Sequence, residues 1–273
     1  MKKDHTFKAS DGEIIRATLF GDENLGKGKV IIFVHGFKGF KDWGFWPYMG
    51  EYFASKGFVA LSFNFSHNGV GESLTEFDEL DKFAKNTYSR EVRELSEIID
   101  AVKAGHFGDI GGKDIVLLGH SRGGGIALAT AAIKPEISKV VLWASVATFN
   151  RHSEDYKNKW RKAGFFEVVN QRTKQVMRLD ATLLEDLEKN ADGLLNLKDA
   201  VKKLDRPLLI AHGEQDISVP PGEAAQLYDW SNQSMTELFK LPSTGHTFGI
   251  VHPFEGTCEV FDRLLLKTAE WAG

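Results

Sequence analysis

Three absences narrow the possibilities for this 273-residue chain. Its single cysteine, Cys258, excludes an internal disulfide and is expected of a protein in a reducing compartment. Purely apolar runs such as Val30–Val34 are far shorter than the roughly 20 residues that cross a bilayer. The N-terminus has a basic start but no apolar segment behind it, so we expect no signal peptide and a cytoplasmic location.

The chain also lacks a strong excess of charge of either sign. Its formal net charge is −4, without a basic stripe or a like-charged tail, which gives no reason to expect nucleic acid or a membrane as partner. No pair of His, Asp or Glu residues has the helical spacing of a metal site, and neither glycine pattern of the nucleotide-binding loops occurs. We therefore expect no metal and no cofactor.

The most informative stretch contains Gly119-x-Ser121-x-Gly123. The apolar run Ile115–Leu118 precedes it and has the length of a buried strand, while Gly124–Ala132 is small and apolar, as in a helix packed closely against a sheet. A strand that turns sharply into a helix exposes the residue in the turn, so the serine is a candidate nucleophile. The alternative is a glycine-rich turn that only binds phosphate.

This strand, turn and helix resemble the nucleophile elbow of the α/β-hydrolase superfamily. The resemblance covers the chain apart from residues 148–203 and is strongest to small esterases related to dienelactone hydrolases, cinnamoyl esterases and serine-aminopeptidase-like hydrolases. It implies an α/β-hydrolase fold, in which a mostly parallel sheet of about eight strands is flanked by helices and carries a helical cap insertion. Dienelactone hydrolases have cysteine where this chain has Ser121, so their substrate is not implied.

Two further residues complete the catalytic triad that the resemblance implies. Ser121 is followed by Asp216 and then His246, the family order of nucleophile, acid and histidine, each after a separate apolar strand. Because the carboxyl ends of parallel strands meet at one edge of a sheet, the three are expected to converge. Glu214 is a rival for the acid and His252 for the histidine, but the His-Gly-x-x-Asp and Gly-His-Thr-Phe settings favour Asp216 and His246.

The loop after the strand Lys29–Val34 is expected to take part in the site as well. Resemblance to the family's His-Gly-x loop implies that the backbone N–H of Phe37, together with that of Arg122, forms the oxyanion hole. The loop residues 35–47 include five aromatic side chains, too many for all to be buried, so an apolar pocket wall is expected. From this loop and from the insertion we expect the following residues at the substrate: Phe40, Trp43, Phe45, Trp160, Phe165 and Phe166.

The rest of the chain predicts one domain with an insertion. An antiparallel hairpin begins the chain at the edge of the sheet, and strands then alternate with helices, as in parallel sheets with right-handed crossovers. Residues 1–147 and 204–273 are predicted to form the core. Residues 148–203 are charge-rich, show no clear strand, and are predicted to form the helical cap, with a capping box at Thr182-x-x-Glu185.

Together with the predicted triad, the resemblance implies a serine hydrolase that cleaves carboxylic esters with small or aromatic acyl groups, as a carboxylesterase or feruloyl esterase does. A peptidase, amidase or thioesterase of the same fold is an alternative. A peptidase would need an acidic anchor for a substrate amino terminus, and the sequence does not assign this role to Glu154, Asp155 or Glu167. A second alternative is a non-catalytic ligand receptor that keeps the fold. The expected partner is a small-molecule ester, and the protein is a monomer or a homodimer.

Overall fold

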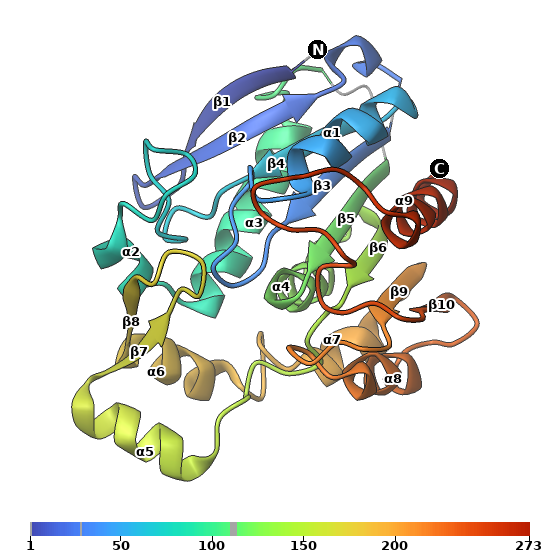
Figure 1. Ribbon diagram of the computed structural model, residues 1–273. Coiled ribbons are helices and arrows are strands. Elements are labelled where there is room, and N and C mark those ends of the chain that lie inside the picture. The colour runs from blue at the N-terminus through green and yellow to red at the C-terminus, as the bar shows by residue number, and fades with distance from the viewer. Residues whose placement is uncertain (1, 28, 110–113) are drawn as a thin grey trace.

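The computed structural model describes residues 2–27, 29–109 and 114–273. In these ranges the centre of the molecule is a sheet of eight strands in the order β1-β2-β4-β3-β5-β6-β9-β10 (Figure 1). The first two, β1 (Lys2–Lys8) and β2 (Ile14–Phe20), form the predicted antiparallel hairpin at one edge. β2 is also antiparallel to its second neighbour, β4. From β4 to β10 in the sheet order, all neighbouring strands pair in parallel.

The remaining strands of the sheet are β3 (Lys29–Val34), β4 (Val59–Phe63), β5 (Asp114–His120), β6 (Ile137–Trp143), β9 (Leu208–Gly213) and β10 (Thr236–Leu241). The helices beside the sheet are α1 (Trp46–Ser55), α3 (Tyr88–Lys103), α4 (Arg122–Ala131), α7 (Leu197–Lys203), α8 (Pro221–Trp230) and α9 (Glu259–Ala272). A short helix, α2 (Leu80–Ala84), precedes α3, and a 3₁₀ turn, Asp22–Asn24, follows β2. None of the helices in the described ranges combines the length and apolar character that a bilayer span requires.

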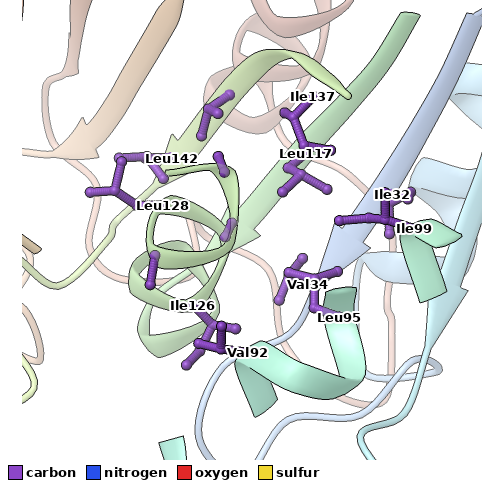
Figure 2. Close-up of a cluster of buried hydrophobic side chains, with 14 of the residues drawn as sticks. Ile32, Val34, Val92, Leu95, Ile99, Leu117, Ile126, Leu128, Ile137 and Leu142 are labelled. Atoms are coloured by element: carbon purple, nitrogen blue, oxygen red, sulfur yellow. The ribbon is translucent and has the colours of Figure 1, made fainter. Parts of the chain in front are cut away.

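Both faces of the sheet are buried because side chains alternate between them along each strand. In β3, Ile32 and Val34 belong to the hydrophobic core under α3, α4, α7 and α8, whereas Ile31 and Phe33 belong to the core under α1 and α9. Figure 2 shows the first of these faces, with Val34 turned toward Leu95 of α3. Continuous apolar strands therefore reflect helices on both sides of the sheet, as the sequence predicts.

The chain between β6 and β9 leaves the sheet, and one prediction about it is wrong. It forms α5 (Glu154–Ala163), a hairpin of β7 (Phe165–Val169) and β8 (Val176–Asp180), and α6 (Ala181–Asn190) before α7 (Figure 1). The two strands pair antiparallel, so the insertion is not purely helical. Residues 176–180 alternate between exposed and buried positions, with a period of two. This alternation suits a strand with one buried face, so the segment forms a strand although it contains charged residues.

The predicted capping box is also wrong. Helix α6 begins at Ala181, and its N-cap, Asp180, makes no side-chain capping hydrogen bond. Thr182 therefore lies inside the first turn instead of at the N-cap. The pairing of β8 with β7 brings Asp180 to the end of a strand, and this tertiary constraint sets the start of the helix two residues earlier than the local pattern predicts.

A separate hydrophobic cluster joins the insertion to the core. We call this the roof cluster: its insertion residues are Trp160, Met177, Leu179, Leu183 and Leu184, and its core residues are Phe40, Val70, Phe77 and Phe83. The core residues come from the loops that follow β3 and β4 and from α2. In contrast, α7 contributes Leu197 and Val201 to the core under the sheet, although it lies within the predicted insertion.

Candidate active site

Ser121 occupies a sharp turn between β5 and α4. Its backbone φ of 58° and ψ of −125° are rare for a residue with a side chain and are tolerated where the surroundings impose them. A Cβ on Gly119 would lie 2.3 Å from the carbonyl oxygen of Gly123, and one on Gly123 would lie 2.2 Å from that of Val34. The glycines of the motif thus allow the strand, turn and helix to approach closely enough to hold the serine in this conformation.

Ser121 is the first member of a chain of hydrogen bonds. The hydroxyl Oγ lies 2.9 Å from Nε2 of His246, and Nδ1 of His246 lies 2.7 Å from Oδ2 of Asp216. A carboxylate can only accept, so Nδ1 donates to it and Nε2 accepts from the serine. His246 follows β10 and Asp216 follows β9, which brings all three residues to the carboxyl edge of the sheet.

The Asp216 side chain is buried but well supplied with donors. Burial raises its pKa, but the hydrogen bonds from His212, His246 and the Val219 N–H outweigh this and hold the pKa below its usual range. Its second oxygen, Oδ1, accepts from the N–H groups of Ser218 at 2.8 Å and Val219 at 2.9 Å. Asp216 is therefore a fixed negative charge that orients the imidazole of His246.

The two rival residues lie elsewhere. Glu214 is exposed to solvent, and its backbone N–H bonds to the next strand. His252 accepts a hydrogen bond from the N–H of Gly44 at 3.0 Å and stacks on Trp43 with 5.9 Å between ring centroids. The structure therefore brings Ser121 together with the preferred acid and histidine and leaves both rivals out of the hydrogen-bond chain.

Two buried histidines support the site from behind. His120 has 2.8 Å between its Nε2 and the carbonyl oxygen of His246, so it donates this bond. Nδ1 of His35 lies 3.0 Å from the carbonyl oxygen of Gly36, so Nε2 of His35 is free to accept from the Phe65 N–H. Burial lowers the pKa of His120 to about 3 and that of His35 to about 4. Both rings are therefore neutral near pH 7.

The two predicted oxyanion donors lie on adjoining backbone segments. A Cβ on Gly36 would lie 3.0 Å from Cβ of Ser121 and 3.5 Å from the backbone nitrogen of Arg122, so the loop after β3 lies against the elbow. In the part of the chain that the structure describes, neither the Phe37 nor the Arg122 N–H donates a hydrogen bond. Both amides are therefore available to an oxygen atom beside Ser121.

The Arg122 side chain ties these two segments together. Its guanidinium donates to Oε1 of the buried Glu91 at 2.6 Å and lies 4.8 Å from the centroid of the Phe37 ring and 5.7 Å from that of Tyr88. The ion pair anchors the first turn of α4 to α3, and the stacked ring keeps the loop after β3 in place.

A cavity of about 480 Å³ opens above Ser121. Trp160 and Phe166 of the insertion line it, as expected from the sequence, and Phe37 joins them from the loop after β3. The cavity walls that sequence reasoning missed are Lys38, Tyr88, Val146, Thr148, Phe149, Arg151, His152, Val168, Leu179, Leu183, Ser218 and Val219. The alternating pattern of the segments around Val168 and Leu179 could have indicated a hairpin that lines the cavity. No local sequence pattern indicates that Tyr88 or Phe149 would line it.

Four residues expected at the substrate do not line this cavity. Phe40 is fully buried in the roof cluster, and Phe45 is fully buried in the core under α1 and α9. Trp43 packs on His252, away from the cavity. Phe165 lies on the other side of β7, where the Arg178 guanidinium lies 3.7 Å from its ring centroid. The expectation failed because contacts outside the cavity engage these side chains, in the buried interior for the first two and with a neighbouring side chain for the last two.

The described residues contain no cluster of three or more His, Cys, Asp or Glu side chains that could hold a metal ion. The groups that the structure brings together above the sheet are instead a hydroxyl, an imidazole, a carboxylate and two free backbone donors. This arrangement, at the carboxyl edge of a mostly parallel sheet, defines the class of α/β hydrolases.

Comparison with known proteins agrees with this assignment. The model of the Alpha/beta hydrolase family matches residues 31–260, and the chain belongs to this family. No curated protein matches the sequence. Among solved structures, the α/β hydrolase GrgF from Penicillium sp. sh18 is similar over 100% of this chain and 98% of its own, with 17% identity and a TM-score of 0.74.

Two other solved structures with the same fold have names that state an activity or a ligand. Est1E from Butyrivibrio proteoclasticus, in a structure with ferulic acid bound, is 18% identical over 98% of this chain and 97% of its own, with a TM-score of 0.72. A monoacylglycerol lipase from Paleococcus ferrophilus is 15% identical over 94% and 98%, with a TM-score of 0.69. At these identities the likeness establishes the fold.

Proposed function

We propose that this protein is a serine hydrolase that cleaves carboxylic esters through an acyl-enzyme intermediate. The observation that carries the proposal is the chain of hydrogen bonds from Ser121 through His246 to Asp216 at the base of the cavity. A serine hydroxyl is a poor nucleophile at neutral pH unless a base in contact with it takes its proton. The geometry supplies the base, and the carboxylate fixes the tautomer of that base.

The proposed reaction has two halves. In the first, Oγ of Ser121 attacks the ester carbonyl carbon while Nε2 of His246 takes the hydroxyl proton, and the same proton then goes to the leaving alcohol. In the second, His246 takes a proton from water as the water oxygen attacks the acyl carbon, and it returns this proton to Oγ of Ser121 as the bond between Oγ and the acyl carbon breaks and the acid leaves. In both halves the N–H groups of Phe37 and Arg122 donate to the developing oxyanion, where one such donor contributes about 10²–10³ in turnover.

The cavity lining favours substrates with a small or aromatic acyl group. Aromatic side chains from three parts of the chain line it: Phe37, Tyr88, Phe149, Trp160 and Phe166. Flat aromatic groups pack well against such side chains, and a cavity of about 480 Å³ accommodates one ring system with a short linker. Feruloyl and other hydroxycinnamoyl esters are therefore included in the proposed range, and the similar fold of Est1E is consistent with this.

The amidase and peptidase alternatives have less support. Glu154, Asp155 and Glu167 are all exposed, and none of them lines the cavity, so the described lining offers no carboxylate to a substrate amino terminus. Thioesters remain compatible with the same geometry, because the attack on the carbonyl is the same.

The proposal is tested with p-nitrophenyl and feruloyl esters of graded size, an aminoacyl anilide and an acyl thioester. We expect the esters to be hydrolysed fastest, Ser121→Ala to abolish turnover, and a fluorophosphonate probe to label the wild type but not this variant. Ser218→Ala, which keeps the backbone N–H that Asp216 accepts and removes only a hydroxyl outside the hydrogen-bond chain, is the matched control and should keep its labelling. A wild type that binds esters without hydrolysing them or reacting with the probe would favour a ligand receptor instead.

A further inference from the structure

The charged side chains that line the cavity are all basic. Among the described residues that line it, no Asp or Glu is present, whereas the basic side chains outside the hydrogen-bond chain of Ser121 and His246 are Lys38, Arg122, Arg151 and His152. Two of these already have partners outside the cavity, because Arg122 pairs with Glu91 at 2.6 Å and Arg151 with Glu223 at 2.5 Å. Burial lowers the pKa of His152, which keeps this ring neutral near pH 7.

Lys38 is the exception. In the described part of the chain its ammonium has no carboxylate within 4.0 Å, and its contacts are the carbonyl oxygen of Val169 at 3.3 Å and the face of the Phe37 ring at 5.5 Å. The side chain is half-buried, and burial lowers its pKa because the charged form loses water. A partly desolvated cation without an anionic partner interacts favourably with any anion that enters the cavity.

The backbone at Lys38 gives a second, independent reason to assign it a role. The N–H of Gly39 bonds to the carbonyl oxygen of Gly36 at 3.0 Å, which closes a four-residue turn with Lys38 in its third position. The φ of Lys38 is 55°, a conformation that glycine or asparagine adopts more readily than lysine. The turn alone would therefore favour glycine, and the lysine side chain is present at a cost in backbone strain.

We propose that Lys38 forms a subsite for an anionic group, a carboxylate or a phosphate, on the ester substrate. This inference rests on the proposed function and specifies its substrate class: esters that carry a negative charge on the part of the molecule facing the loop after β3. The aromatic walls hold the body of the substrate, and the ammonium selects the charged derivative over its neutral counterpart. The Phe37 ring below the ammonium keeps it directed along one side of the cavity.

The test compares kcat/KM for matched anionic and neutral esters. One pair carries the charge on the acyl side, phenyl hydrogen terephthalate against its terephthalamate, and the other on the leaving group, 4-carboxyphenyl butyrate against 4-carbamoylphenyl butyrate. In both pairs the para position prevents the carboxylate from attacking the ester itself. We expect a preference for the anion of about tenfold in at least one pair, which corresponds to about 1.4 kcal/mol, and a smaller preference at 1 M salt.

Variants then assign the preference to the lysine. Lys38→Met should lower the anion-to-neutral ratio about tenfold, and Lys38→Glu should lower it further. Lys38→Gly should lower the ratio by the same factor as Lys38→Met while raising the melting temperature, because it relieves the positive φ. The matched control is Lys159→Met, an exposed lysine of α5 outside the cavity, which should keep the wild-type ratio. Because each ratio is measured within one variant, effects on folding or on the catalytic chain cancel.

The two proposals fail in different ways. Hydrolysis of the neutral esters with a ratio that Lys38→Met leaves unchanged would overturn the anionic subsite and leave the esterase intact. Hydrolysis of none of the four esters by the wild type, with no fluorophosphonate labelling, would overturn the esterase and the subsite with it.

Discussion

The floor and the roof of the cavity are built in different ways. The floor consists of Ser121, Asp216 and His246, which follow three parallel strands and are held by hydrogen bonds between side chains and backbone. The roof is the side of the cavity that the insertion forms, and it includes Trp160 and Phe166. Packing of side chains in and around the roof cluster holds these two residues in place. Directional hydrogen bonds hold the proposed catalytic atoms in place to fractions of an ångström. Packed apolar side chains tolerate substitution better, so the substrate-binding walls can change without loss of the fold.

The largest effect should come from breaking the floor at Asp216. Asp216→Asn retains the shape of the side chain but removes the negative charge and favours the wrong tautomer of His246, so kcat should fall about 10⁴-fold. Steady-state assays with the best p-nitrophenyl ester measure this fall in kcat. Glu214→Gln, two residues earlier and exposed, should retain at least half of the activity. An equal loss in the two variants would mean that the acid has been assigned to the wrong residue.

The second effect concerns the backbone of the floor. Gly123→Ala places a Cβ 2.2 Å from the Val34 carbonyl oxygen and 2.4 Å from that of His35, and backbone atoms cannot move aside cheaply. The free energy of unfolding should fall by about 2–3 kcal/mol in urea titrations. Gly222→Ala in α8 has no atom within 4 Å of the added Cβ and should instead be neutral or slightly stabilising. If both substitutions cost the same, close approach is not what requires Gly123.

The third effect is a pH dependence of stability from His120, behind the floor. Its pKa is lowered from 6.5 to about 3 in the folded protein, so below pH 6.5 the unfolded chain binds a proton that the folded chain does not. The free energy of unfolding is therefore highest above pH 6.5 and falls as the pH drops toward 3. His120→Gln should reduce the loss between pH 7 and pH 5 by about 2 kcal/mol. Parallel curves for the variant and the wild type would contradict the neutral, buried ring.

The smallest effect should come from the roof. Trp160→Ala removes an aromatic wall whose Nε1 donates to the Leu179 carbonyl oxygen at 3.1 Å, and it should raise KM for aromatic esters about tenfold with kcat changed less than threefold. Trp230→Ala, at the end of α8 and outside the cavity, should leave KM unchanged. A fall in kcat as large as that in Asp216→Asn would show that roof and floor do not act separately.

The sequence predicts the floor and the sheet better than the roof for a physical reason. Each floor residue follows an apolar strand, and the carboxyl ends of parallel strands necessarily share an edge, so local patterns suffice to bring Ser121 near Asp216 and His246. The family and the fold are confirmed. The catalytic roles and the domain limits at 148 and 203 stay predictions.

The roof depends on contacts that no local pattern encodes. Phe45 and Trp160 are both large aromatic residues in segments expected to reach the substrate, and their local sequence does not separate them. The packing of distant helices places the first in the core and the second in a cavity wall. The hairpin of β7 and β8 was missed because its alternation is short and mixed with charged residues. Lys38 was missed because a lysine in a glycine-rich turn reads as a solvated side chain until its surroundings are known.

The outermost strands of the sheet bear on how the molecules meet one another. β1 places Lys2, Lys3 and Lys8 along one border of the sheet, and β10 places Glu237 and Lys240 along the other. A strand from a neighbouring molecule could add to either border only by drawing these ionised groups out of water. These charges discourage crowded copies of this protein from joining edge to edge into aggregates, although the six strands between the borders are mostly apolar.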